Sequence, residues 1–190
     1  MSLEVRWSIP CRPISLAEAS DRTGVSLISL KQLYRDGVFG PPPSAVRDVS
    51  MYEVAVMFAI KAADSLKIAR ERLLPMLRSI AGATYVQYQL TEIVEGRCNP
   101  LRNGGTPDLN IQLCIRLRSP TARSDLEARL PGGPIETHRY VCFDDKNSFL
   151  CDDLGTIDEP LADLRIIDGW DLARKMKEAL KSERLYMHIA

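Results

Sequence analysis

The stretch "SLAEASDRTGVSLISLKQLYRDGVF", residues 15–39, contains two helix starts, a tight turn and a glycine stop. Ser15 and Glu18 have the spacing of a capping box, which predicts that a helix begins at this point. Gly24 predicts the end of that helix, because glycine tolerates the left-handed geometry of a helix C-terminus. Ser26 can cap a second helix, and Gly37 follows the last turn of that helix. The stretch therefore predicts two short helices joined by a turn.

The rest of the first 82 residues also predicts helices. The segment "GPPPS", residues 40–44, predicts a rigid extended connection, since proline fits neither a helix interior nor a central strand. Apolar spacing from Ser50 predicts a third helix, with a break between residues 64 and 67. A shorter helix then ends at Gly82.

After Gly82 the apolar pattern changes to the alternation of half-buried strands. Residues 85–94 and 109–118 predict strands, and residues 137–143 and 148–152 predict a hairpin around the loop "DDKN". Residues 161–167 and 184–189 predict further strands, and Asp168 is the predicted cap of a helix over residues 169–183. The predicted fold class is α+β, with an all-α domain over residues 1–82 and an α+β domain over residues 83–190 whose sheet is mainly antiparallel.

The charge is balanced overall but unevenly distributed. The chain has 25 Lys and Arg against 25 Asp and Glu, of which residues 1–82 hold 11 basic and 8 acidic ones. The remaining residues hold 14 basic and 17 acidic ones. A mildly basic first part joined to an acidic second part suits a DNA-facing module fused to a different domain.

Residues 14–80 resemble the N-terminal DNA-binding domain of MerR-type transcriptional regulators. The stretch "TGVS", residues 23–26, matches the family's turn, and "RDGVF", residues 35–39, is similar to the exit of its recognition helix. Arg47 matches the wing arginine, and Ser50 matches the cap of the helix pair that follows. The resemblance implies a winged helix-turn-helix. A predicted strand replaces the family's long coiled coil, so we expect residues 83–190 to form the dimer interface.

The second helix is then the recognition helix, whose N-terminal part enters the major groove. Gln32 carries the amide needed for bidentate contact with adenine, and Lys31 can reach guanine or a phosphate. Arg22, Arg47 and Lys61 are expected to contact phosphates beside the groove. The outward positions of the recognition helix are predicted to be Ser26, Ile28, Ser29, Lys31, Gln32 and Arg35.

These features predict a cytoplasmic transcriptional regulator that binds double-stranded DNA as a homodimer. A C-terminal domain that senses a small-molecule effector rests on architecture alone, because no site residue points to one. The alternative is a protein-interaction adaptor or antitoxin-like module that uses the same helices against a protein. We find no apolar run of about 18 residues that would predict a membrane span, and no signal peptide.

The sequence predicts no enzyme, cofactor or metal site. His138 and His188 have no partner at ligand spacing, and the five cysteines form no CxxC pair. Six acidic residues are interpreted as a solvated face: Asp144, Asp145, Asp152, Asp153, Asp158 and Glu159. If they held a divalent metal instead, the protein would belong to a third functional class, a metal-dependent enzyme. Aromatic residues are interpreted as core in preference to a ligand pocket: Trp7, Tyr85, Tyr88, Tyr140, Phe143 and Trp170.

Overall fold

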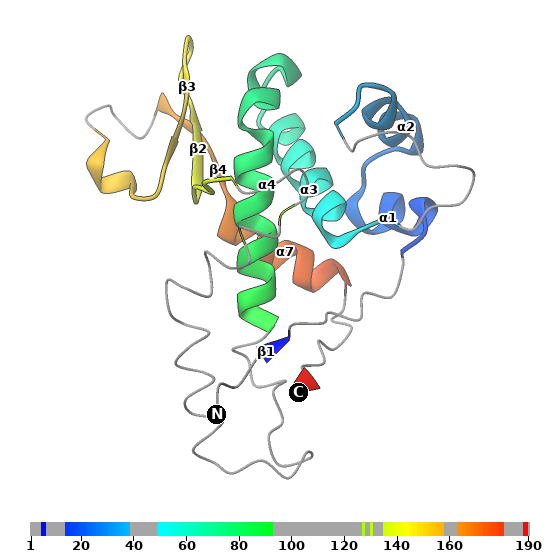
Figure 1. Cartoon of the computed structure of the whole chain (residues 1–190). Coiled ribbons are helices and arrows are strands. Elements are labelled where there is room, and N and C mark those ends of the chain that lie inside the picture. The colour runs from blue at the N-terminus through cyan, green and yellow to red at the C-terminus, as the bar shows by residue number, and fades with distance from the viewer. Residues whose placement is uncertain are drawn as a thin grey trace.

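The computed structural model describes residues 5–6, 14–38, 49–92, 127, 130, 135–157, 163–180 and 188–189. Within these residues the chain forms five α-helices, a three-stranded sheet and a two-stranded sheet, so the predicted mixed α+β class is confirmed. Two long helices stand at the centre, a pair of short helices lies on one side of them, and the three-stranded sheet lies on the other (Figure 1).

The opening stretch folds as the two predicted helices, α1 (Leu16–Thr23) and α2 (Leu27–Arg35). The hydroxyl oxygens of Ser15 and Ser26 each accept a backbone N–H three residues later at 3.1 Å, which caps both helices. Gly24 ends α1 with a φ of 69°, in the left-handed region that its sequence position predicted. Local signals alone therefore set where both helices begin and where α1 ends.

α3 (Met51–Ser65) follows, and its cap is more complete than the sequence pattern alone predicted. The Ser50 hydroxyl accepts the N–H of Glu53 at 3.2 Å, and the Glu53 carboxylate accepts the N–H of Ser50 at 2.7 Å. Upstream, Val49 donates to the carbonyl of Ile14 at 2.7 Å, so the chain before α3 pairs with the chain before α1. Residues 39–48 between them, the predicted wing with Arg47, lie outside the described residues.

The predicted break after α3 is confirmed at Leu66 and Lys67, where Lys67 has a φ of 54°. α4 (Arg70–Glu92) then continues to Glu92, so the predicted helix end at Gly82 and the predicted strand over residues 85–94 are wrong. Gly82 is buried inside the helix, where a Cβ atom would lie 2.9 Å from Thr137 Cγ2. Close packing, and not a helix stop, is the role that the structure gives this glycine.

The hairpin prediction is confirmed. β2 (Tyr140–Phe143) pairs antiparallel with β3 (Ser148–Cys151), and β4 (Arg165–Asp168) pairs antiparallel with the other edge of β2. The order is β3-β2-β4, so the three-stranded sheet is antiparallel, as expected. β4 begins four residues later than the predicted strand over residues 161–167. The predicted strand over residues 109–118 lies outside the described residues.

α7 (Gly169–Leu180) follows β4 directly, and the Asp168 carboxylate accepts the N–H of Trp170 at 2.8 Å in the predicted cap. α7 packs against α4, α3 and α1. Near the chain ends, β1 (Val5–Arg6) pairs antiparallel with β5 (His188–Ile189), the last part of the predicted strand over residues 184–189. None of the helices described is long and apolar enough to cross a membrane.

One hydrophobic cluster unites the described helices with the three-stranded sheet. It contains Leu30 and Leu33 of α2, Phe143 of β2 and Met176 of α7, each fully buried. The expected domain boundary after Gly82 lies inside α4, and residues on both sides of it belong to this cluster. A continuous helix, and not a linker, joins the two parts of the chain.

Candidate nucleic-acid interface

α2 has one buried face and one exposed face. Leu30 and Leu33 are completely buried and Tyr34 is 7% exposed, so three side chains fix this helix on the core. Ile28 on the opposite face is 82% exposed. Of the predicted outward positions, Ser29 is half-buried and the others are exposed: Ser26, Ile28, Lys31, Gln32 and Arg35.

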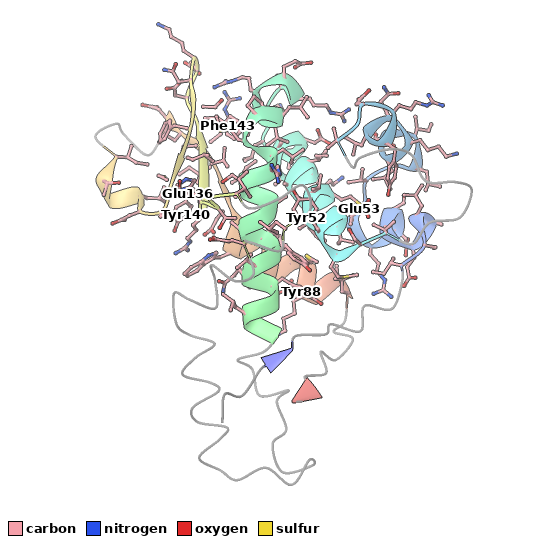
Figure 2. The ribbon with its side chains drawn as sticks, in the orientation of Figure 1. Tyr52, Glu53, Tyr88, Glu136, Tyr140 and Phe143 are labelled. Carbon is pink, nitrogen blue, oxygen red and sulfur yellow. The ribbon has the colours of Figure 1, made fainter. Side chains whose placement is uncertain are left out.

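A buried carboxylate fastens α2 to α3. Glu53 is only 3% exposed, and its Oε1 atom accepts the hydroxyl of Tyr34 at 3.4 Å. Its other oxygen accepts the N–H of Ser50, so one side chain serves both the cap of α3 and the position of α2. Figure 2 shows Glu53 at the place where α3 faces the short helices. Glu53 was not among the residues predicted from the sequence, although its spacing from Ser50 is that of a capping box.

The turn between α1 and α2 is held from two sides. The Ser20 hydroxyl donates to the carbonyl of Val25 at 2.7 Å, and Val25 itself is 4% exposed. From α3, the ammonium of Lys61 donates to the carbonyl of Gly24 at 3.3 Å. The N-terminus of α2 is therefore presented to solvent from an ordered turn, with its capping residue Ser26 exposed.

The predicted cationic residues fall into different environments. Lys31 and Arg35 lie on the exposed face of α2. Arg22 instead points toward α7, where its Nη1 atom donates to the carbonyl of Leu180 at 3.0 Å and its Nη2 atom pairs with Glu18. The structure thus leaves Lys31 and Arg35 exposed along α2, places Lys61 at the α1–α2 turn and ties Arg22 to the end of α7.

Gln32 has an intrahelical partner. Its Nε2 atom donates to the Oδ1 atom of Asp36 at 2.7 Å, one turn along the helix. A contact between Gln32 and a base would therefore replace an existing hydrogen bond. Asp36 also places a negative charge at the C-terminal end of α2, which is the negative end of the helix dipole.

Of the predicted acidic set, Asp144, Asp152 and Asp153 have structural partners, and Asp145 is exposed in the hairpin loop. Asp144 accepts the N–H of Lys146 at 2.6 Å and also that of Asn147, and these backbone hydrogen bonds hold its pKa below the usual range. Asp152 accepts the N–H of Arg139 at 2.8 Å and contacts His138 Nδ1 at 3.1 Å. Asp153 caps a short 3-10 helix, η3 (Leu154–Thr156).

No group of three metal-ligating side chains comes together in the described part of the chain. Asp158 and Glu159 lie outside that part, and for His188 the structure describes only its pairing in β5. Asp144, Asp152 and Asp153 therefore act in turns and caps of the hairpin region.

Most of the described aromatic residues lie in or against the core. Phe143 is fully buried, Tyr140 and Tyr88 are 9% and 5% exposed, and Tyr85 is half-buried. Figure 2 labels the first three of these residues. Trp170 differs, because it is 40% exposed and its ring lies 4.1 Å from the guanidinium carbon of Arg139. Trp7 lies outside the described residues.

Comparison with protein-family models, curated proteins and solved structures produced no match for this chain.

Proposed function

We propose that this protein is a DNA-binding transcriptional regulator in which α1, the turn and α2 form the helix-turn-helix of a MerR-like winged domain. The observation that carries the proposal is the sidedness of α2. Leu30, Leu33 and Tyr34 anchor the helix, while Lys31, Gln32 and Arg35 project from its opposite side. A fixed helix with outward polar side chains of this length is suited to the major groove.

In this mechanism the two exposed cations of α2 and the ammonium of Lys61 approach the phosphates, and Gln32 contacts a base edge after release from Asp36. The exposed N-terminus of α2 offers further N–H groups and the positive end of its dipole to the backbone. A single copy presents few positive charges, so useful affinity requires two copies on one operator. Homodimer formation is part of the proposal, and sedimentation of the protein with and without DNA measures it.

A salt titration with random-sequence duplex DNA tests the proposal. Neutralising phosphates releases counterions, so the logarithm of affinity must fall linearly with the logarithm of salt concentration. Lys31→Ala should lower that slope by about one unit, because the variant no longer neutralises one phosphate. Lys146→Ala is the matched control, because Lys146 is exposed in the hairpin loop, away from α2. An absence of DNA binding at low salt would remove the proposal.

Specific recognition is tested by selecting bound sequences from random DNA. Gln32→Ala should weaken binding to the selected site by about 1–3 kcal/mol and relax the preference at one base pair. Asp36→Ala frees the Gln32 amide and removes a negative charge, so it should strengthen binding. If both variants bind the selected site like the natural chain, the assignment of α2 as a recognition helix is wrong.

One observation favours the alternative of a protein-binding adaptor. Leu27 and Ile28, which are adjacent at the start of α2, are 41% and 82% exposed. An apolar pair of this kind can contact thymine methyl groups, but it also suits a protein surface. Ile28→Ser distinguishes the regulator from the adaptor. In a regulator the variant should reduce DNA affinity only at sites with thymine. An adaptor would show no salt-dependent DNA binding at all.

A further inference from the structure

A cavity of about 290 Å³ lies between α3, β4 and α7. Much of its wall is apolar and comes from all three elements: Phe58, Leu66, Ile166, Ile167 and Leu172. The volume is close to the lower end of the range of roughly 300–1,000 Å³ in which small-molecule sites occur. A ligand of modest size with an apolar body would fit such a wall.

The cavity also reaches a backbone edge. β4 is an edge strand of the three-stranded sheet, with β2 on one side and no strand of the described residues on the other. Ile166, Ile167 and Asp168 all line the cavity although successive side chains of a strand point to opposite faces. Lining residues on both faces of β4 indicate that the cavity lies beside the edge of β4 that faces away from β2.

The charges at the cavity favour an anion at one position. Asp168 accepts two hydrogen bonds from Arg139, at 3.2 and 3.0 Å. Asp171 pairs with Lys175 at 2.7 Å and with Arg174, and these hydrogen bonds hold its pKa low. Both lining carboxylates are thus already neutralised by cations, and Lys175 is itself engaged.

Lys61 is the lysine at the cavity whose charge is not paired with a carboxylate of the described residues. It lines the cavity, and within the described residues its ammonium makes one polar contact, with the carbonyl of Gly24, and no ion pair. A carboxylate would gain a charge-assisted hydrogen bond there. The same lysine supports the turn between α1 and α2, since Gly24 is the residue that links those helices.

We propose that this cavity binds a small organic monocarboxylate with an apolar body, and that the ligand acts on DNA binding through Lys61. The apolar part of the ligand packs between α3, β4 and α7, and its carboxylate accepts a hydrogen bond from the ammonium of Lys61. The ammonium then moves away from the Gly24 carbonyl, so the support of the turn changes. The ligand site stands on its own, whereas the effect on DNA rests on the proposed function.

Binding is tested without DNA, by a fluorine NMR titration with 4-fluorobenzoate and with neutral 4-fluorobenzamide. We expect saturable binding of the carboxylate and binding of the amide weaker by about tenfold, the range of one charge-assisted hydrogen bond. Lys61→Met should weaken the carboxylate by a similar factor, and Lys146→Met should not. Equal affinity for the two probes, or no saturable binding, would overturn the site.

Two cavity-filling variants locate the ligand. Ala62→Phe and Ser65→Leu each add bulk to a residue that lines the cavity, and Ser65 lies exposed at the end of α3, so its variant does not disturb the core. We expect either variant to abolish binding of 4-fluorobenzoate. A folded Ser65→Leu protein that binds the probe with unchanged affinity would place the ligand elsewhere and contradict the proposal.

The link to α2 is measured by repeating the DNA titration in the presence of 4-fluorobenzoate. Saturating probe should change the DNA affinity of the natural chain at least several-fold and leave that of Ser65→Leu unchanged. Probe binding with unaltered DNA affinity would overturn the link but keep the site. Where the chain binds no DNA at all, the proposed function fails, and movement of the Gly24 amide signal on probe binding decides whether the cavity controls the turn.

Discussion

At the scale of single residues, Gly82 shows how one residue type can carry two opposite signals. Glycine after an apolar helical run predicts a helix end, because it accepts left-handed geometry at no cost. In the structure Gly82 has an ordinary helical position, and its missing side chain admits Thr137 and Leu130. The sequence around Gly82 does not reveal this, since the partners come about 50 residues later.

The first prediction concerns this close approach. Gly82→Ala gains about 1 kcal/mol of helix propensity, but its Cβ would lie 2.9 Å from Thr137 Cγ2 and 3.0 Å from Leu130 Cδ1. Overpacking costs about 1–3 kcal/mol, so we expect a net loss of about 1 kcal/mol in the free energy of unfolding, measured with urea. Thr137→Ser removes the methyl group while keeping a hydroxyl. The double variant should therefore lose less stability than the sum of the losses in Gly82→Ala and Thr137→Ser. A loss equal to that sum would contradict the packing argument.

The second prediction concerns Cys142, which is buried 3.8 Å from the sulfur of Cys151. Burial and the neighbouring Cys151 raise the pKa of Cys142 from 9.0 to about 12. Between these two values the unfolded chain releases the proton and the folded chain keeps it, so stability must fall as the pH rises through this window. The free energy of unfolding of Cys142→Ala should decline less steeply with pH. Parallel curves for the two proteins would show that the thiol does not contribute.

At the scale of elements, the sequence predicted the helix caps and turns that depend only on neighbouring residues. The caps at Ser15 and Ser26, the turn at Gly24 and the hairpin loop after β2 all appear as predicted, because each depends on a few neighbouring residues. The second half of α4 was missed for the opposite reason. In residues 85–92 apolar and polar residues nearly alternate, a pattern that suits a strand, yet Val86 and Tyr88 of this segment pack as part of a helix.

In the candidate site, too, some features follow from local sequence and others need the tertiary fold. The exposure of Lys31, Gln32 and Arg35 followed from helical spacing alone. The hydrogen bond of Arg22 to Leu180 joins residues 158 positions apart, and the cavity needs three elements that only the tertiary fold brings together. Sequence periodicity describes one helix at a time, so it could not predict either feature.

The third prediction separates two roles for arginine on the short helices. Arg22→Met keeps the apolar stem but removes the hydrogen bond to the Leu180 carbonyl, so we expect it to lower the free energy of unfolding by about 1 kcal/mol. Arg35→Met should leave stability nearly unchanged and reduce both DNA affinity and its salt dependence, because Arg35 is exposed on α2. Denaturation and DNA titration of both variants measure this contrast. A larger loss of DNA affinity in Arg22→Met than in Arg35→Met would restore Arg22 as a phosphate contact.

At the scale of the whole molecule, α4 is the element that makes the two predicted parts one structure. It packs against α3 in the first part and against α7 and the sheet in the second. Figure 1 shows it between the short helices and the strands. The α1–α2 unit therefore rests on a core to which residues on both sides of position 82 contribute. A ligand bound among α3, β4 and α7 has a short physical route to α2, because these elements share that core.

The fourth prediction follows from this continuity. A fragment of residues 1–82 ends inside α4 and lacks Met176 and Leu172 of α7, both buried in the common cluster. Since the fragment leaves apolar surface of α3 and α4 uncovered, we expect it to lack the dispersed amide NMR spectrum of a folded domain. The full chain should unfold in one calorimetric transition over the described core, with equal calorimetric and van't Hoff enthalpies. A fragment of residues 1–92 restores α4 but not α7, so it should also fail to fold. Folding of either fragment would show that the part with α1 and α2 is autonomous, and a ligand between α3 and α7 would then have no obligatory effect on it.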